Sequence, residues 1–175
     1  MNIEDDVNRF EADLDHALNQ VRDCVAWLRS APTDDLRFLV AERLPALGSA
    51  AVPELQRILD DSTSSRGLRY LAAWVAVEVG DRGDSVSVLC SEVEAGAEWS
   101  LPAANILAKH RILEGARVVA EALDRVDPRS DLEVMGYATA LRDLGGKLPE
   151  SVRQRIVAES SPWIARAVAT DFPAD

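Results

Sequence analysis

Few side chains in this sequence have the chemistry of ligands or nucleophiles, and those few lie far apart. His16 follows Asp13 by three residues, a spacing that places two metal ligands on one helix face. No third ligand is signalled nearby, so we interpret the pair as part of an exposed acidic helix face. His110 falls at the end of a predicted helix, where the helix dipole favours a protonated imidazole. We therefore predict no metal site.

The cysteines and carboxylates give no catalytic arrangement either. Cys24 lies among Val21, Val25 and Leu28, and Cys90 is next to Leu89, so both are predicted as small core residues rather than activated thiols. The HExxH, GxSxG, P-loop and GxGxxG motifs do not occur. Carboxylate pairs fall at predicted helix starts and exits, where capping and solvation account for them. We expect no catalytic or cofactor-binding residue, and no enzyme.

Helical hairpins are the elements that position the remaining polar residues. Each consists of a helix, a break near a glycine and a second helix with an apolar stripe. Gly48 and Gly80 end the first two leading helices 32 residues apart, and Gly145 follows 65 residues later, about two more periods. Repetition at this period is typical of stacked helical arrays. We predict four hairpins over residues 34–160.

Alignment of the hairpins gives columns that are apolar throughout. The first-helix columns are Leu44, Ala76, Ala108 and Leu141, and Val40, Ala72, Ala104 and Tyr137. The second-helix columns are Leu55, Leu89, Val119 and Val152, and Leu59, Val93, Leu123 and Ile156. Other inward-facing predictions include Leu36, Leu39 and Leu132. In the third hairpin, Ile112 stands where the alignment predicts a glycine.

The two ends of the chain are predicted to cover the array. Residues 3–30 carry an apolar stripe at three- and four-residue steps and form one helix or two closely joined helices, ending before Pro32. We predict residues 1–32 as an N-terminal capping region with a polar outer face, and residues 161–175 as a C-terminal cap or tail. Trp27 and Trp74 are expected to fill core or inter-repeat gaps. Half-exposure is an alternative for Trp99 and Trp163 near helix starts, but core or staple packing is favoured for each.

The segments that carry the clearest repeat are LRFLVAERLPALGSAAVPELQRILDD and LRYLAAWVAVEVGDRGDSVSVLCSEV. With a proline near the end of the first helix, an AxPxL-like start of the second and a terminal acidic pair, the first resembles the HEAT-like repeats of short bacterial proteins. The resemblance covers about residues 34–160 and implies a right-handed α-α superhelix within a single domain, residues 1–175. It also implies that partners bind the concave face lined by the second helices. Armadillo-like and other α-α arrays remain open.

Charge indicates the class of partner. The formal net charge is −11; residues 1–96 hold 18 acidic and 9 basic side chains, and residues 97–175 hold 12 and 10. A chain this acidic repels phosphate backbones, which argues against nucleic acid and favours a basic protein partner. No apolar run approaches the length of a membrane span, and no basic region followed by an apolar region begins the chain. We expect a cytoplasmic protein with no membrane partner; its oligomeric state is left open.

One set of residues follows from the alignment as a candidate site. Asp60, Glu94 and Asp124 come five residues after the first aligned core position of successive second helices, about 140° from the core direction. We predict that they form an acidic column that binds a basic protein, together with Arg57 and Glu121. An immunity or antitoxin protein that blocks a cationic toxin fits this description. The alternatives are a regulatory subunit or a HEAT-like enzyme such as a bilin lyase or a DNA glycosylase.

Overall fold

The computed structural model describes residues 19–31 and 33–174. Helices make up most of this part of the chain and no strand occurs in it, which confirms the all-α prediction. The chain divides into two compact units, an N-terminal unit of residues 1–85 and a C-terminal unit of residues 86–175. The superhelical arrangement and the single domain stay predictions.

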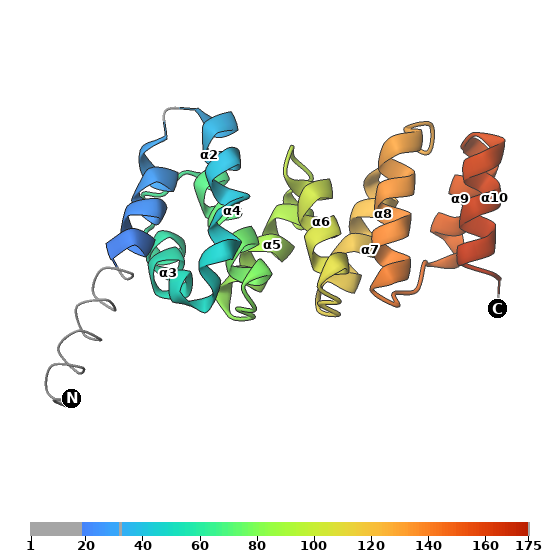
Figure 1. Cartoon of the computed structure of the whole chain (residues 1–175). Helices are drawn as coiled ribbons and strands as arrows, with labels where there is room; N and C mark the ends of the chain where they lie inside the picture. Colours follow the sequence, from blue (N-terminus) through green and yellow to red (C-terminus); the bar gives the residue numbers. More distant parts are fainter. Residues whose placement is uncertain (1–18, 32, 175) are drawn as a thin grey trace, which may run out of the picture. The chain divides into compact units, whose positions relative to one another are not determined.

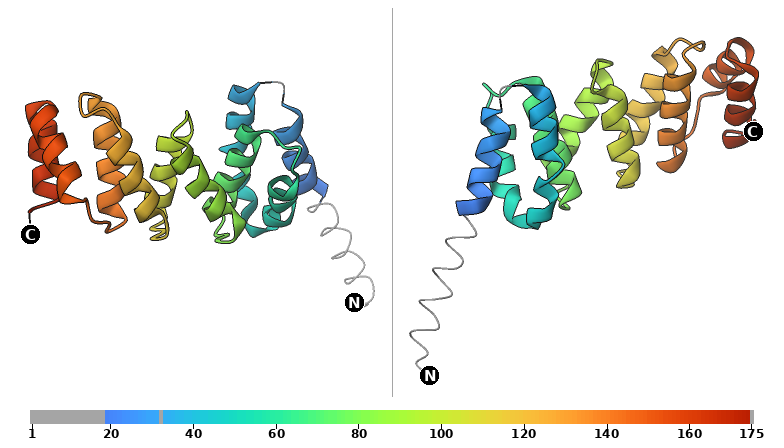
Figure 2. Two further views of the ribbon diagram at one scale, coloured as in Figure 1. Left: turned by 180° about the vertical axis from the view of Figure 1, so that it is seen from behind. Right: turned by 45° about the horizontal axis from the view of Figure 1, so that its top comes forward.

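The N-terminal unit begins with a helix over residues 19–30, followed by α2 (Asp34–Ala41), the 3-10 helix η1 (Leu44–Ala51), α3 (Val52–Asp60) and α4 (Arg66–Glu78). α4 packs against both α2 and α3, and helix 19–30 runs alongside them (Figures 1 and 2). Hydroxyl caps start two of these helices: the Thr33 oxygen accepts from the Leu36 N–H, and the Ser65 oxygen from the Leu68 N–H. An Arg22–Glu54–Arg57 ion-pair chain links helix 19–30 to α3.

The first hairpin breaks earlier than predicted. The sequence predicts a continuous helix with a kink in the last turn at Pro45, but α2 ends at Ala41 and η1 begins at Leu44. Proline has no N–H to continue the hydrogen-bond pattern and fits best in a first turn, which is where it lies in η1. The chain then turns at Gly48, where φ is 61°. This break directs Leu44 into the core while Arg43 stays at the surface.

The C-terminal unit is made of helix pairs. α5 (Asp84–Ala95), whose first turn begins before the unit boundary, is followed by α6 (Ser100–Lys109), α7 (Gly115–Arg125), α8 (Asp131–Asp143), α9 (Glu150–Glu159) and α10 (Pro162–Asp171). α8 packs against α6, α7 and α10, and α10 packs against α9 (Figures 1 and 2). A buried hydrogen-bond chain joins three of these helices: the Tyr137 hydroxyl donates to Ser100 Oγ (2.7 Å), which donates to the Val93 carbonyl (3.0 Å).

The leading helices end in the same turn, with one correction to the predicted alignment. After α4, α6 and α8, an N–H bonds back to the carbonyl five residues earlier: Asp81 to Ala76, Ile112 to Leu107 and Gly146 to Leu141, each at 2.9 Å. The residue before each donor has positive φ: 96° at Gly80, 50° at Arg111 and 67° at Gly145. The prediction that Ile112 takes the glycine position is therefore wrong by one residue, because Arg111 adopts the left-handed conformation there.

This turn also corrects the core columns. Both second-helix columns are buried at every position, as predicted. In the first helices, the turn aligns Leu107, rather than Ala108, with Ala76 and Leu141. Four residues earlier, Ala103 takes the column position predicted for Ala104. All of these residues are buried. Three leucines predicted to face inward are instead exposed: Leu36 (46%), Leu39 (53%) and Leu132 (80%).

Candidate functional site

Helix 19–30 carries two apolar strips rather than one. Val21, Val25 and Leu28 are buried against the rest of the N-terminal unit. A second strip, at steps of three and four residues, runs through Cys24, Trp27 and Ala31. At about 100° per residue this strip lies beside the buried one, so a single supporting layer of helices does not cover it. Trp27 is therefore 70% exposed, and its prediction as a core residue is wrong.

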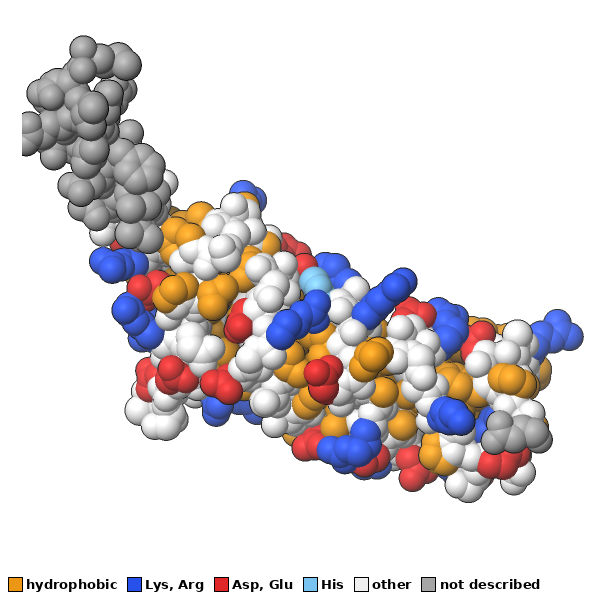
Figure 3. All heavy atoms as spheres, turned by 90° about the horizontal axis from the view of Figure 1, so that it is seen from below, with side chains coloured by type: hydrophobic (Ala, Val, Ile, Leu, Met, Phe, Trp, Pro, Cys, Tyr) orange, Lys and Arg blue, Asp and Glu red, His pale blue; other side chains and the backbone are white. Residues whose placement is uncertain are grey.

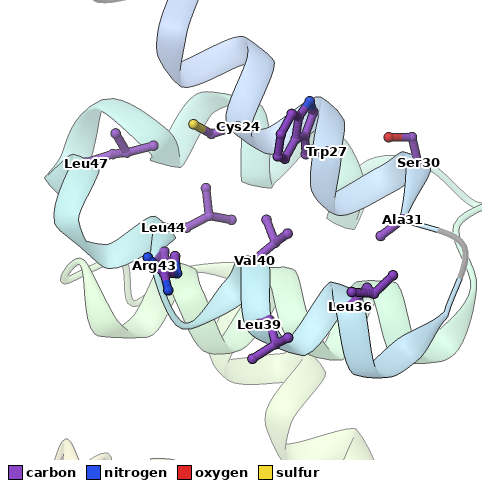
Figure 4. Close-up of a pocket in the computed structure, with 10 residues that line it drawn as sticks. All are labelled: Cys24, Trp27, Ser30, Ala31, Leu36, Leu39, Val40, Arg43, Leu44 and Leu47. Atoms are coloured by element: carbon purple, nitrogen blue, oxygen red, sulfur yellow. The ribbon is translucent and has the colours of Figure 1, made fainter.

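The second strip forms one wall of a groove. The opposite wall comes from α2 and η1, and the groove has a volume of about 580 Å³ (Figure 4). Most of the lining side chains are apolar, and the lining consists of Cys24, Trp27, Ser30, Ala31, Leu36, Leu39, Val40, Arg43, Leu44 and Leu47. We call this feature the apolar groove. It lies wholly within the N-terminal unit.

A second hollow continues the apolar groove along the same helix. It has a volume of about 500 Å³ and shares three lining residues with the groove, Cys24, Trp27 and Leu47. Its other lining residues are Gln20, Asp23 and Ala26. Together the two features follow helix 19–30 over its whole length, about 18 Å at 1.5 Å per residue.

An aromatic contact with α4 stabilises the α2 wall of the groove. Phe38 of α2 stacks on Trp74 of α4 with ring centroids 5.1 Å apart. The Trp74 indole N–H donates to Glu78 Oε1 at 3.2 Å. Trp74 is half-buried between α2 and α4, in partial agreement with the predicted core position. α2, which contributes Leu36 and Leu39 to the groove lining, is thus held against α4.

The groove has the chemistry of a binding surface. Ser30 and Arg43 supply its polar side chains, and no carboxylate or histidine is among its lining residues. Large exposed apolar side chains gathered around a hollow are typical of protein interaction sites, and tryptophan is the most frequent binding anchor. The sequence signal that could have located the groove is the second strip, since a helix with one buried face needs one strip alone.

The predicted acidic column is exposed but its carboxylates have partners. Asp60, Glu94, Asp124, Arg57 and Glu121 all lie on the surface. Asp60 accepts a hydrogen bond from Gln56 (3.0 Å), and Asp124 pairs with Arg155 (3.2 Å). Arg117 pairs with both Glu94 (3.0 Å) and Glu121 (2.6 Å), and Arg57 pairs with Glu54. Hydrogen bonds first with Glu121 and then with Glu94 raise the pKa of Arg117 above its ordinary value. Because Asp60 belongs to the N-terminal unit and Glu94 to the C-terminal unit, the column itself stays a prediction.

The C-terminal unit brings two of these residues to a shallow hollow beside α7 and α9. Glu121 and Asp124 line it together with Arg117 and Lys147, in a volume of about 430 Å³. Figure 3 shows the same mixture on a larger scale, with acidic and basic side chains interspersed over one face. Glu121 and Asp124 thus lie on a surface of mixed charge within the C-terminal unit.

Much of the net charge of the first half comes from its beginning. Residues 1–18 hold six acidic side chains and one basic side chain, and so account for −5 of the −9 in residues 1–96. This segment, with the predicted His16–Asp13 pair, lies outside the described residues. Residues 19–96 carry 12 acidic and 8 basic side chains. The described surface of the N-terminal unit is therefore less acidic than the sequence total suggests.

The remaining candidate residues lie at a helix end or are partly buried. His110 caps the C-terminus of α6, as predicted. Cys90 and Cys24 are half-buried rather than fully buried, and burial raises the pKa of the Cys90 thiol, with a further contribution from Glu94. Trp99 is half-buried and Trp163 is 56% exposed.

The described residues show neither of two other kinds of site. No group of three or more histidine, cysteine, aspartate or glutamate side chains suited to a metal ion occurs among them. In the same part of the chain, no helix has the length and apolar character needed to cross a membrane. Comparison of the chain with known proteins gave no match to a family model, to a curated protein or to a solved structure.

Proposed function

We propose that this protein is a non-enzymatic protein-binding module and that the apolar groove is its binding site. The ligand is an amphipathic helix of a protein, laid along helix 19–30. The observation that carries the proposal is the exposure of Trp27 (70%) and Leu39 (53%) on opposite walls of one groove. Grooves of this kind bind helices through apolar residues spaced three and four apart.

The dimensions and the lining support a helix as the ligand. The apolar groove and its continuation run parallel to a helix of about 18 Å, which corresponds to a ligand helix of about 12 residues. A short helix buries only one stripe, so its charged face stays in water while its stripe contacts Trp27 and the groove leucines. Arg43 at the edge of the lining suits an acidic residue on that charged face.

The HEAT-like solenoid belongs to this proposal as the scaffold. The repeated turn at Gly80, Arg111 and Gly145 and the buried second-helix columns support it, because the columns recur in all four hairpins and the turn in three of them. In such arrays each hairpin contacts its neighbours, and the terminal hairpins differ from the internal ones. An apolar strip on the first helix of the array departs from the polar outer face that a terminal cap requires.

The experiment that tests the proposal uses a labelled synthetic helix. A fluorescent peptide of about 15 residues is made from leucine, glutamate and lysine, with leucines at steps of three and four. It is titrated with the full chain, and binding is followed by anisotropy. We expect Leu39→Asp to weaken binding at least tenfold, because it places a carboxylate in the apolar groove.

A matched control separates the groove from apolar exposure in general. Leu132 is even more exposed (80%) but lies on the C-terminal unit, so Leu132→Asp is expected to leave the affinity for the peptide unchanged. Equal loss of peptide affinity in Leu39→Asp and Leu132→Asp contradicts the proposal.

The predicted acidic surface gives a second version of the same function, in which a basic protein contacts Glu94, Glu121 and Asp124. Their exposure favours it. The ion pairs with Arg117 and Arg155 oppose it, since a basic partner would have to replace these arginines. This version predicts affinity that falls steeply with salt, whereas the groove version predicts weak salt dependence. The immunity protein, the regulatory subunit and the HEAT-like enzyme stay predictions.

A further inference from the structure

We infer that residues 3–14 of a second copy of this chain occupy the apolar groove, so that the protein is a dimer with reciprocally exchanged N-terminal segments. The inference rests on the proposed function and names its partner. Residues 1–18 lie outside the described part of the chain.

The segment has the pattern that the groove requires. Ile3, Val7, Phe10 and Leu14 follow one another at steps of four, three and four residues, and the intervening residues are mainly polar or charged. A helix with this pattern presents one apolar stripe. Residues 3–14 would span about 18 Å as a helix, the length of helix 19–30 along which the groove runs.

Charge favours this segment as well. Residues 1–18 hold six carboxylates and one arginine, while the lining of the apolar groove contains Arg43 and no carboxylate. Among the charged residues of helix 19–30, Asp23 lines the continuation of the groove, whereas Arg22 pairs with Glu54 of α3. Within the apolar groove itself, an acidic amphipathic segment meets an apolar lining whose one charged side chain is Arg43.

The connection to the rest of the chain favours a second copy over the same copy. To enter its own groove, the chain would have to reverse direction between Leu14 and residue 19, where the described helix begins. The four residues available are Asp-His-Ala-Leu, and neither glycine nor proline occurs anywhere in residues 1–31. Without a turn signal, reversal is disfavoured, and alanine and leucine favour continued helix.

Exchange of the N-terminal segments between two copies also limits the assembly to two chains. If each segment fills the groove of the other copy, both apolar stripes and both grooves are covered, and no site is left for a third copy. The two contacts are equivalent, as a two-fold axis requires. The expected product is a dimer rather than a filament.

The test measures the mass of the full chain by light scattering over a range of concentrations. We expect twice the mass of one chain. Phe10→Asp, in the segment, and Leu39→Asp, in the groove, are each expected to give monomers with an unchanged helical circular dichroism spectrum. Leu132→Asp is the control and is expected to remain a dimer.

An equimolar mixture of the two monomeric variants distinguishes exchange from binding within one copy. The Phe10→Asp chain has an intact groove and the Leu39→Asp chain has an intact segment, so one of the two contacts is restored in a heterodimer. We expect the average mass of the mixture to rise above that of either variant alone. Binding within one copy predicts no rise and overturns the inference.

Other outcomes separate this inference from the proposed function. A monomeric unmodified chain, or a Phe10→Asp variant that stays dimeric, overturns the inference. The labelled peptide is then titrated with Phe10→Asp, in which the groove is vacant. Binding at least tenfold tighter than to the unmodified chain supports exchange. Equal binding keeps the groove as a binding site but rejects the second copy as its occupant, and no binding rejects both.

Discussion

The N-terminal and C-terminal units are both built from packed helices but differ in what the side chains at their surfaces contact. In the C-terminal unit, side chains reach from one helix to the end of another: Arg125 donates to the carbonyls of Val93 and Glu94, and Arg155 to those of Asp124 and Val126. In the N-terminal unit, Trp27, Leu36 and Leu39 are exposed to solvent instead. The difference fits the proposal that the first unit binds another molecule through the apolar groove.

Exposed apolar side chains occur in the C-terminal unit as well, so exposure alone does not distinguish the two units. Trp163 of the C-terminal unit is 56% exposed, but its indole N–H donates to Asp131, which also accepts from Ser161. Leu132 is also exposed (80%). Trp27 differs from Trp163 because leucines of α2 and η1 line the same groove as its indole ring.

The largest expected effect compares a leucine from each unit. Leu141→Ala, at a fully buried site of α8, is expected to lower the free energy of unfolding by about 2–5 kcal/mol through lost contacts and a cavity. Leu39→Ala, at the groove, is expected to change it by less than about 0.5 kcal/mol. Urea unfolding followed by circular dichroism measures both. Similar losses at the two sites would place Leu39 in the core and remove the contrast between the units.

A smaller effect is expected from the buried hydrogen bonds of the C-terminal unit. Tyr137→Phe removes the hydroxyl that donates to Ser100 and is expected to cost about 1–2 kcal/mol, since the site is buried. Trp163→Phe also removes one N–H donor, but from an exposed contact, and is expected to cost less than about 0.5 kcal/mol. The same unfolding measurement applies. If Tyr137→Phe is neutral, the hydroxyl does not help to join α6 and α8.

The helix-ending turns allow a test with opposite signs in the two units. Arg111→Gly is expected to stabilise the chain by about 1 kcal/mol, because glycine adopts positive φ without a steric penalty. Gly80→Ala is expected to destabilise it by about the same amount, and open space around Gly80 makes backbone conformation the main cause. Thermal unfolding of both variants measures the shift in midpoint. A loss of stability in Arg111→Gly would mean that the arginine side chain offsets its strained backbone.

The smallest expected effect concerns acid. Hydrogen bonds from Arg153 and then Gln154 lower the pKa of Glu150 from 4.5 to about 2. A carboxyl whose pKa is lower in the folded state stabilises that state above the unfolded pKa, and the contribution is lost as pH falls from about 4.5 to about 2. Because Glu150 is exposed, we expect only a slight change. Glu150→Gln should make the unfolding midpoint less sensitive to pH in this range, and an unchanged pH profile would contradict the assignment.

The helical fold follows from spacing that the sequence displays directly. Apolar residues at the second-helix positions recur in every hairpin, and burial requires this periodicity, so those columns could be predicted. The third turn could not be located to the residue, because glycine is the usual signal for positive φ and Arg111 gives none. A shift of one residue there changed which alanines and leucines align.

The candidate site was less predictable than the fold. The exposure of Asp60, Glu94 and Asp124 follows from helix geometry alone. Their ion-pair partners do not follow from helix geometry, because the contacts with Arg117 and Arg155 depend on how far side chains extend between helices. Trp27 was assigned to the core since apolar residues surround it in sequence, but burial depends on whether a second layer of helices covers that face, and none of the described helices does.

The contacts of Arg125 and Arg155 with carbonyl oxygens have a consequence for acidic conditions. Ion pairs such as Arg117–Glu94 weaken when the carboxylate gains a proton. A backbone carbonyl has no proton to gain in this range, and a guanidinium does not lose one. The links from α7 to α5 and from α9 to α7 are thus independent of pH, whereas the charged surface above them is not. The C-terminal unit should therefore keep its helix spacing in mild acid while its outer surface becomes more positive.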